Sequence, residues 1–351
     1  MPSKVTRPRP VLMMPLRRCG SHALRLRLNS STDFYAPYPL HIVDFMPLID
    51  LYGDLENDIN YFQMITDVIG LQSGLMVKWP GIVFDPVEIF DAIKDEPRNV
   101  HRIVYELLFR IGLSQGASVV MDKSLDSVFY AEDLLELFPD MLFLNVIRDP
   151  RAQVSSMNKA IIHDFDTMLN TMTWVKAYEK AQQLTEKYPD KVLTIRYEDF
   201  VSHQDVIVHQ ICDFFEISYS DEMLNIEKSS EAASIANRSA LWVSNSSAPI
   251  PANVDKFKKT LTMQEIEIIE TLSGDIMERF GYEKMTACNA DVSDEAIIDA
   301  RNVSVTNKYK AWEELRLKDP KDYMLRKYRS DYLEMIKMRL MREKDILLQT
   351  A

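Results

Sequence analysis

A cationic side chain and two hydroxyl groups lie close together in the middle of the chain. The apolar run from Met141 to Ile147 predicts a buried strand, and apolar residues resume at helical spacing after Pro150. Arg148 then stands at the carboxyl end of the strand, with Ser155 and Ser156 in the first helical turns. Parallel α/β sheets bind ligands in this crevice, and a guanidinium with hydroxyls suits an anion. The pattern predicts a phosphate site.

A second anion site is predicted near the N-terminus. Val11 to Met14 form a short apolar run typical of a buried strand, and apolar residues return from Leu24 to Leu28 in a helix or extended segment. A turn between strand and helix presents free backbone N–H groups, and Gly20 lets the main chain approach a ligand closely. No GxxxxGK[ST] sequence occurs in the chain. The predicted loop consists of Arg17, Arg18, Cys19, Gly20, Ser21 and His22.

Together these stretches resemble the donor-binding motifs of sulfotransferases that use 3′-phosphoadenosine-5′-phosphosulfate (PAPS). Arg148 and Ser156 match the arginine and the serine eight positions later that hold the 3′-phosphate in that family. The positions that match the family's 5′-phosphosulfate loop are Arg18, Gly20 and Ser21. His22 departs from the usual serine or threonine, although its imidazole N–H could still donate to the ligand.

Weaker similarity to the family continues along residues 120–124, 195–200 and 254–259, so the resemblance covers roughly residues 9–285. It implies an α/β fold with a parallel β-sheet flanked by helices, similar to that of P-loop NTPases. The alternation of strand and helix patterns independently favours a parallel sheet with right-handed crossovers.

The resemblance also implies a reaction, the transfer of a sulfuryl group from PAPS to a hydroxyl or amine by in-line displacement. Arg18 and the loop N–H groups would bind the 5′-phosphosulfate, and Lys123 would stabilise charge on the bridging oxygen. Lys123 could instead be an exposed lysine that pairs with Asp122 or Asp126. Such a transfer depends on positioning and electrostatics, and the family mechanism requires no metal.

The C-terminal basic loop would assist Arg148 and Ser156 on the 3′-phosphate. Its candidate residues are Lys256 and Lys258, with Arg238 as a further possibility. The alternative is that this loop is a solvated run of charges.

The general base is the least defined residue of the predicted site. Family members with a histidine base carry it two positions after the equivalent lysine, where this chain has Leu125. Other members use a glutamate about twenty residues beyond the phosphosulfate loop, and the nearest titratable residue there is His41. A histidine has a suitable intrinsic pKa for this role. His41 is the first candidate, with Asp44 and Asp33 as substitutes.

Composition narrows the functional class. The chain has 351 residues, of which 46% are hydrophobic and 27% are charged, as in ordinary globular proteins. A net charge of −12 argues against nucleic acid as the main partner. No apolar run is long enough to span a membrane, the N-terminus lacks a secretory pattern, and three widely spaced cysteines suit a reducing compartment. We therefore expect a cytoplasmic protein.

Four segments are predicted along the chain: an N-terminal arm over residues 1–8, the sulfotransferase-like domain over 9–285, a linker over 286–302 and a helical extension over 303–351. The Ser-rich and Asn-rich stretch from Ser229 to Ala252 is a candidate lid. The extension carries too many apolar residues for a free tail, so we expect it to pack on the core or on a second copy of the chain. A homo-oligomer through these helices is therefore a candidate assembly.

The aromatic and apolar content of residues 34–52 favours a hydrophobic small molecule as acceptor. Two rival functions remain. A nucleotide kinase of the P-loop type would share the sheet and an anion loop, but should carry GxxxxGK[ST]. A non-catalytic PAPS-binding or scaffold protein is favoured by His22 and Leu125, which depart from the family pattern.

Overall fold

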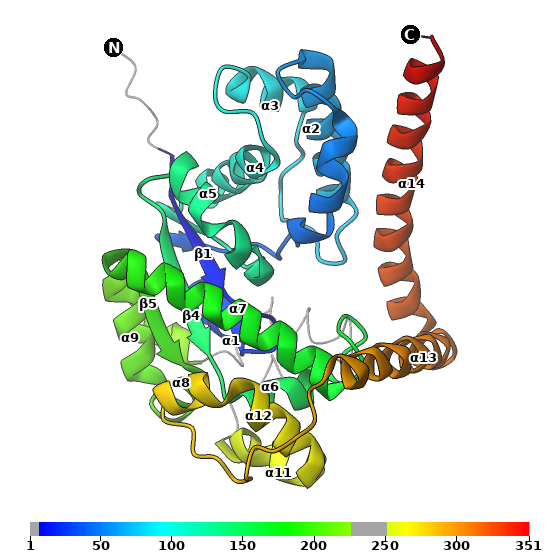
Figure 1. Cartoon of the computed structure of the whole chain (residues 1–351). Coiled ribbons are helices and arrows are strands. Elements are labelled where there is room, and N and C mark those ends of the chain that lie inside the picture. The colour runs from blue at the N-terminus through cyan, green and yellow to red at the C-terminus, as the bar shows by residue number, and fades with distance from the viewer. Residues whose placement is uncertain (1–6, 226–250, 351) are drawn as a thin grey trace.

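A parallel sheet of five strands forms the centre of the protein, in the order β2-β3-β1-β4-β5. The structure is a computed structural model and describes residues 7–225 and 251–350. The strands are β1 (Arg9–Met14), β2 (Phe34–Tyr35), β3 (Val119–Asp122), β4 (Leu142–Ile147) and β5 (Val192–Arg196). The predicted α/β class is confirmed (Figure 1). Strand β2 has two residues, which are too few to give a periodic signal in the sequence.

Side-chain alternation along β1 defines the two faces of the sheet. Val11 and Met13 are fully buried in one hydrophobic cluster, and Leu12 and Met14 are fully buried in the other. Helices α1 (Ser21–Leu28), α8 (Tyr197–Ser202) and α9 (Gln204–Phe215) contribute to the first cluster. Helices α2 (Asp58–Ser73), α3 (Pro86–Ile93), α4 (Val100–Ser114), α5 (Ala131–Leu137), α7 (Thr167–Lys187) and α12 (Met263–Arg279) contribute to the second.

The turn after β4 begins a short helix, α6 (Pro150–Met157), as the break at Asp149 and Pro150 predicts. The Asp149 carboxylate accepts from the backbone N–H of Arg151 at 2.9 Å and so caps the helix. Helix α12 begins with a capping box, since Thr262 and Glu265 exchange backbone and side-chain hydrogen bonds. A four-residue helix, α11 (Phe257–Thr260), precedes α12.

Two long C-terminal helices, α13 (Asp294–Lys318) and α14 (Pro320–Thr350), follow the domain. The prediction of a linker over 286–302 is wrong from residue 294 onward, because Ser293 caps α13 and two acids occupy its first turn. That stretch is polar because most of its residues lie on the exposed side of the helix.

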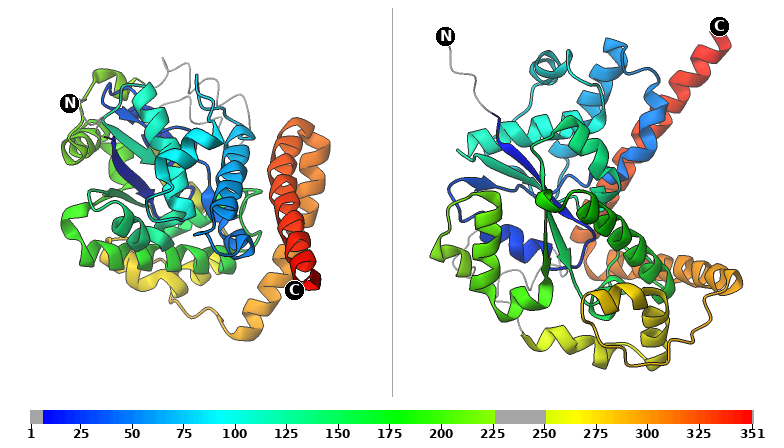
Figure 2. Two further views of the ribbon diagram at one scale, coloured as in Figure 1. Left: turned by 90° about the horizontal axis from the view of Figure 1, so that it is seen from above. Right: turned by 60° about the vertical axis from the view of Figure 1, so that its left-hand side comes forward.

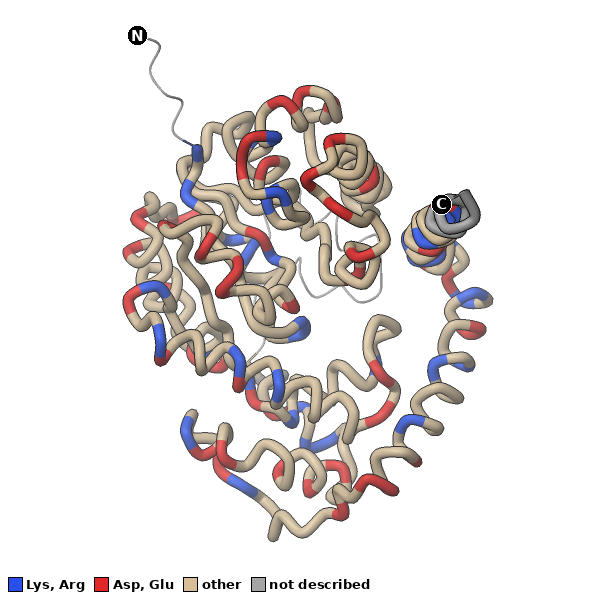
Figure 3. Tube along the Cα trace, turned by 45° about the horizontal axis from the view of Figure 1, so that its top comes forward, with Lys and Arg blue, Asp and Glu red and all other residues tan. Residues whose placement is uncertain are grey.

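Helix α14 packs on the same chain, alongside α2 (Figures 1 and 2). Ile336 and Leu340 are 3% and 2% exposed and belong to the second hydrophobic cluster. Lysines, arginines and acidic residues are interspersed along both C-terminal helices (Figure 3). The predicted lid from Ser229 to Ala252, with Arg238, lies outside the described residues except for its last two positions.

Candidate active site

The loops that follow three neighbouring strands meet at one edge of the sheet. Residues 15–20 follow β1, Lys123 follows β3, and Arg148 follows β4. Because β1 lies between β3 and β4, all three loops open into the same crevice at the carboxyl ends of the strands. The topology therefore brings the two predicted anion-binding stretches together.

Two left-handed backbone positions shape the loop after β1. Arg18 has a φ of 74° and Gly20 a φ of 92°. A Cβ atom on Gly20 would lie 2.4 Å from the Tyr197 ring, which is closer than any side chain tolerates. Glycine is thus required both by the backbone angle and by the ring packed against it. The loop leads directly into α1, whose first backbone N–H groups lack intrahelical partners.

Hydrogen bonds join the two anion-binding stretches. The Arg18 Nε donates to the Ser156 Oγ at 3.0 Å, and the Arg148 Nη1 donates to the Arg18 carbonyl at 2.7 Å. The Arg148 guanidinium also stacks 4.4 Å above the centroid of the Tyr197 ring. The adjacent Ser155 is turned elsewhere, since its hydroxyl lies 2.8 Å from the Thr260 Oγ1. Of the two predicted serines, only Ser156 therefore faces the loop.

A cavity of about 660 Å³ opens beside this loop. From the core domain it is lined by Arg17, Arg18, Ser21, His22, Tyr38, His41, Asp44, Met76, Lys123, Ile161 and Ile162. From α13 and α14 it is lined by Lys308, Tyr309, Trp312, Glu313, Tyr323, Leu325, Arg326, Lys327, Arg329, Ser330 and Leu333.

Lys123 and Arg18 are two cations that line the same cavity. Lys123 is 2% exposed, so the alternative of an exposed strand-end lysine is wrong. Asp126 pairs with Arg17 instead, and Asp122 accepts from the Ser124 backbone N–H at 2.8 Å. Burial, followed by the charge of Arg25, lowers the pKa of Lys123 to about 7. Burial and then Arg148 lower the pKa of Arg18 to about 10. Such a site favours an anionic ligand.

His41 projects into the cavity from a backbone held in the left-handed region, at a φ of 52°. Its backbone N–H donates to the Ser124 Oγ at 3.1 Å, next to Lys123. Burial, followed by the charges of Arg17 and Lys123, lowers the pKa of His41 well below its ordinary value. The imidazole is therefore neutral at pH 7.

The two acids considered as substitutes for His41 lie in different places. Asp44 lines the cavity, and its carboxylate is paired with Arg329 at 3.0 Å. Asp33 is not among the described residues that line the cavity, and its carboxylate accepts from the Ser218 backbone N–H at 2.9 Å.

Several other predicted site residues are not among the described residues that line the cavity: Cys19, Gly20, Arg148, Ser156, Lys256 and Lys258. Cys19 is fully buried, and burial raises the pKa of its thiol to about 11. Lys256 is exposed, and Lys258 pairs with Asp255 at 2.8 Å on the surface. Lys256 ends a short turn that packs against α6 and α8, so this basic loop lies beside the helix that carries Ser156.

Comparison with known proteins agrees with this geometry. A sequence model described as “Sulfotransferase family” matches residues 10–221, which include every residue of both anion-binding stretches. The chain belongs to the sulfotransferase family.

Two curated relatives resemble part of this sulfotransferase. Protein-tyrosine sulfotransferase 2 of Gallus gallus is 29% identical over 158 residues, which are 43% of each chain. Protein-tyrosine sulfotransferase 1 of Danio rerio is 26% identical over 157 residues, which are 43% of this chain and 44% of that relative. The chain thus matches less than half the length of either relative.

Two solved structures share the fold. The sulfotransferase domain of the Synechococcus PCC 7002 olefin synthase superposes with a TM-score of 0.55 at 18% identity, over 80% of this chain and 97% of the domain. The sulfotransferase domain of the curacin biosynthetic pathway gives a TM-score of 0.51 at 15% identity, over 80% of this chain and all of the domain. No helix within the described ranges has the length and apolar character to cross a membrane.

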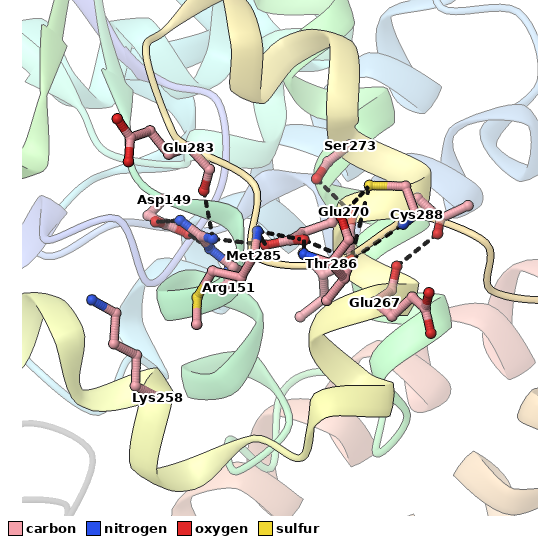
Figure 4. Close-up of polar contacts among 12 residues, drawn as sticks. Asp149, Arg151, Lys258, Glu267, Glu270, Ser273, Glu283, Met285, Thr286 and Cys288 are labelled. Atoms are coloured by element: carbon pink, nitrogen blue, oxygen red, sulfur yellow. Dashed lines mark hydrogen bonds and ion pairs between the residues drawn. The ribbon is translucent and has the colours of Figure 1, made fainter.

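A buried ion network holds helix α6 of this sulfotransferase in place (Figure 4). Arg151 donates to Asp149 and to Glu270, each at 2.7 Å, and Glu270 is fully buried on α12. Glu270 also accepts from the Met285 and Thr286 backbone N–H groups. The network therefore fixes the segment that leads to the C-terminal helices against the start of α6.

Sequence reasoning missed the contribution of the C-terminal helices to the site. Tyr309, Trp312, Tyr323, Arg326 and Arg329 all line the cavity. Their apolar content predicted packing, but nothing local in the sequence indicated which side of each helix would face the phosphosulfate loop. Tyr197 was recognised only as part of a family-like segment, and its stacking on Arg148 depends on the turn after β5.

Proposed function

We propose that this sulfotransferase moves a sulfuryl group from PAPS to a hydroxyl or amine of a small, largely apolar acceptor. The observation that carries this proposal is the direct contact between the two anion-binding stretches, from Arg18 to Ser156 and from Arg148 to the Arg18 carbonyl. One continuous cationic surface then reaches from the 3′-phosphate motif to the edge of the cavity. A nucleotide with phosphate groups at both the 3′ and 5′ positions fits such a surface.

Donor binding would use the cations according to their positions. Arg18 and the N–H groups at the start of α1 would hold the 5′-phosphosulfate, while Arg148 and Ser156 would hold the 3′-phosphate. The Arg148 Nε supports this assignment, because it is buried and has no hydrogen-bond partner among the described residues. Buried N–H groups without partners are uncommon, and a phosphate oxygen would supply the acceptor.

In the transfer step the acceptor oxygen forms a bond to sulfur while the bond from sulfur to the bridging phosphate oxygen breaks. His41 is neutral at pH 7 and lines the same cavity as Lys123, so it would take the proton that the acceptor hydroxyl loses. Lys123 and Arg18 would stabilise the charge that develops on the departing phosphate. The proton then leaves His41 to solvent after the products dissociate.

The acceptor side of the cavity supports an apolar substrate with an aromatic or aliphatic body. Its walls include Met76, Ile161, Ile162 and Leu333, together with the rings of Trp312 and Tyr323. Apolar walls with few polar groups bind small molecules by burial and orient them by those few groups. The predictions of a cytoplasmic location, of a mechanism without metal and of association through α13 and α14 stay predictions.

Calorimetry with 3′-phosphoadenosine-5′-phosphate (PAP), the desulfated product, tests the proposal. We expect PAP to bind at least about tenfold more tightly than 5′-AMP, ATP or NAD, because a charge-assisted phosphate contact contributes about 1.5–3 kcal/mol. Arg148→Ala should remove this preference for PAP. A preference for ATP would favour the kinase alternative, and equal affinity for PAP and 5′-AMP would overturn the assignment of Arg148.

Turnover separates the enzyme from a donor-binding scaffold. With PAPS and a set of phenols and aliphatic alcohols, we expect release of PAP together with a sulfated acceptor. Tight PAP binding with no transfer to any acceptor, and no faster hydrolysis of PAPS than in buffer, would favour the non-catalytic alternative. The non-catalytic alternative is favoured by Leu125, a fully buried residue at the position where some family members have a histidine.

A further inference from the structure

One arginine of α14 reaches across the cavity to the backbone of the His41 loop. The Arg329 Nη2 donates to the carbonyls of Leu40 and His41, each at 2.9 Å, and to the Asp44 carboxylate at 3.0 Å. Its Nε donates to the same carboxylate at 3.2 Å. A single guanidinium thus joins three acceptors within the 40–44 segment, although it lies 285 residues from Asp44 in the chain.

The His41 backbone is consequently held on both sides. Its N–H donates to Ser124, the residue after Lys123, and its carbonyl accepts from Arg329. These bonds hold a left-handed conformation, which a residue with a Cβ atom adopts only at a cost in free energy. Arg329 thus holds the carbonyl side of this peptide from α14.

We propose that Arg329 is a positioning residue for sulfuryl transfer, fixing the loop that carries His41 in the orientation that directs the imidazole toward Lys123 and the phosphosulfate loop. The proposal rests on the proposed function and on His41 as its base. It assigns a catalytic purpose to α14, which lies outside the residues 10–221 that match the family. The active site would then be incomplete without the C-terminal helices.

The competing explanation is that Arg329 only docks α14 on the domain. The same helix offers a matched control, because Arg339 also pairs with the core, through the buried Asp67 of α2. Arg339 and Asp67 do not belong to the described cavity lining. If ion pairs of α14 act only in docking, removal of either arginine should have the same effects.

The experiment compares Arg329→Ala, Arg329→Lys and Arg339→Ala in the full chain, with 2-naphthol and water as test acceptors for PAPS. We expect Arg329→Ala to lower kcat by about 10- to 100-fold, since a loop displaced by about 1 Å can reduce rates that far. The KM for PAPS and the Kd for PAP should stay within about twofold, and Arg329→Lys should recover part of kcat because one ammonium still reaches a carbonyl. Arg339→Ala should lower the melting temperature about as much as Arg329→Ala does, but it should leave kcat within about twofold of the wild type.

A readout without any acceptor accompanies the kinetics. The His41 imidazole is titrated by NMR, and its signals are assigned with the variant His41→Gln. The side chains that can influence its pKa are those of its neighbours Arg17, Lys123, Arg329, His22 and Tyr38. Arg329→Ala should raise the pKa of His41 toward its ordinary value, and Arg339→Ala should not. Equal kcat losses in the two alanine variants, or an unchanged His41 titration in Arg329→Ala, would overturn the proposal. If the wild-type protein bound no PAP, the proposed function would fail, and the His41 titration would still decide the role of Arg329.

Discussion

The Arg18 Nε lies 3.0 Å from the Ser156 Oγ, although 138 residues separate the two in the chain. Arg18 belongs to the loop after β1, and Ser156 to the helix after β4. Because β1 and β4 are neighbours in a parallel sheet, the loops that follow them meet at the same edge of the sheet. This contact brings the two predicted anion-binding stretches together at one end of the sheet.

Ser156 provides the sharpest test of the 3′-phosphate site, since Ser155 is its matched control. Ser156→Ala should weaken PAP binding by about 10- to 150-fold, as expected for loss of a hydrogen bond to a charged group of about 1.5–3 kcal/mol. Binding of 5′-AMP should change by less than about twofold, because that ligand lacks the 3′-phosphate. Ser155→Ala removes only the contact with Thr260 and should leave both affinities near those of the wild type. Similar losses of PAP affinity in the two variants would contradict the assignment.

Lys123 should make donor binding depend on pH. With a pKa lowered to about 7 by burial, Lys123 is only partly protonated at neutral pH in the free protein. A bound anion raises that pKa, so the complex holds more protons, and the affinity for PAP falls as the pH rises above about 7. Calorimetry in buffers of different ionisation enthalpy should show proton uptake at pH 7.5. Lys123→Arg keeps the charge at every pH and should remove most of this uptake; equal uptake in both proteins would assign it to another group.

Gly20 should not tolerate a methyl group. Its φ of 92° and a Cβ position 2.4 Å from the Tyr197 ring combine backbone strain with a steric clash. Gly116 has a φ of 75° with no heavy atom within 4 Å, so Gly116→Ala isolates the strain, which costs about 1–2 kcal/mol. Gly20→Ala should cost more in urea unfolding and should also weaken PAP binding, because Tyr197 must move away from Arg148. Equal losses in the free energy of unfolding in the two variants would show that the Tyr197 ring moves aside without destabilising the protein.

Glu270 should be essential for stability at neutral pH. Burial raises the pKa of this carboxyl, but hydrogen bonds from Thr286, Met285 and Arg151 outweigh burial, so its net pKa lies below the ordinary 4.5. A carboxyl whose pKa is lower in the folded than in the unfolded protein stabilises the fold at pH values above the unfolded pKa. This stabilisation is lost as the pH falls through the folded pKa.

We expect Glu270→Gln to lower the free energy of unfolding at pH 7 by about 3–5 kcal/mol, since it leaves Arg151 without one of its buried partners. Glu267→Gln on the same helix should cost less than about 1 kcal/mol, because Glu267 is less buried and accepts only from the Asn289 backbone N–H. The difference between the two variants should shrink in unfolding experiments at acid pH. A loss for Glu270→Gln no larger than that for Glu267→Gln would contradict the role of the network.

Much of the fold was predictable because its signals are local. Strand β4 begins one residue after the start of the apolar run predicted over 141–147 and ends at the same residue. Buried strands between parallel neighbours read as continuous apolar runs, and caps such as Thr262 mark helix starts within a few residues. The linker failed as a prediction because an exposed helix such as α13 has the composition of a polar loop.

By itself, the sequence determined the family and the parallel sheet and predicted the two anion-binding stretches, because each depends on residues that are close together in the chain. Tertiary structure alone decided that Ser156 rather than Ser155 faces Arg18, that Tyr197 stacks on Arg148, and that Arg329 bonds to the His41 loop. Each of these contacts joins elements that are far apart in sequence, and its geometry depends on how whole helices and strands pack. Local periodicity tells which face of an element is buried, whereas only packing tells which element covers that face.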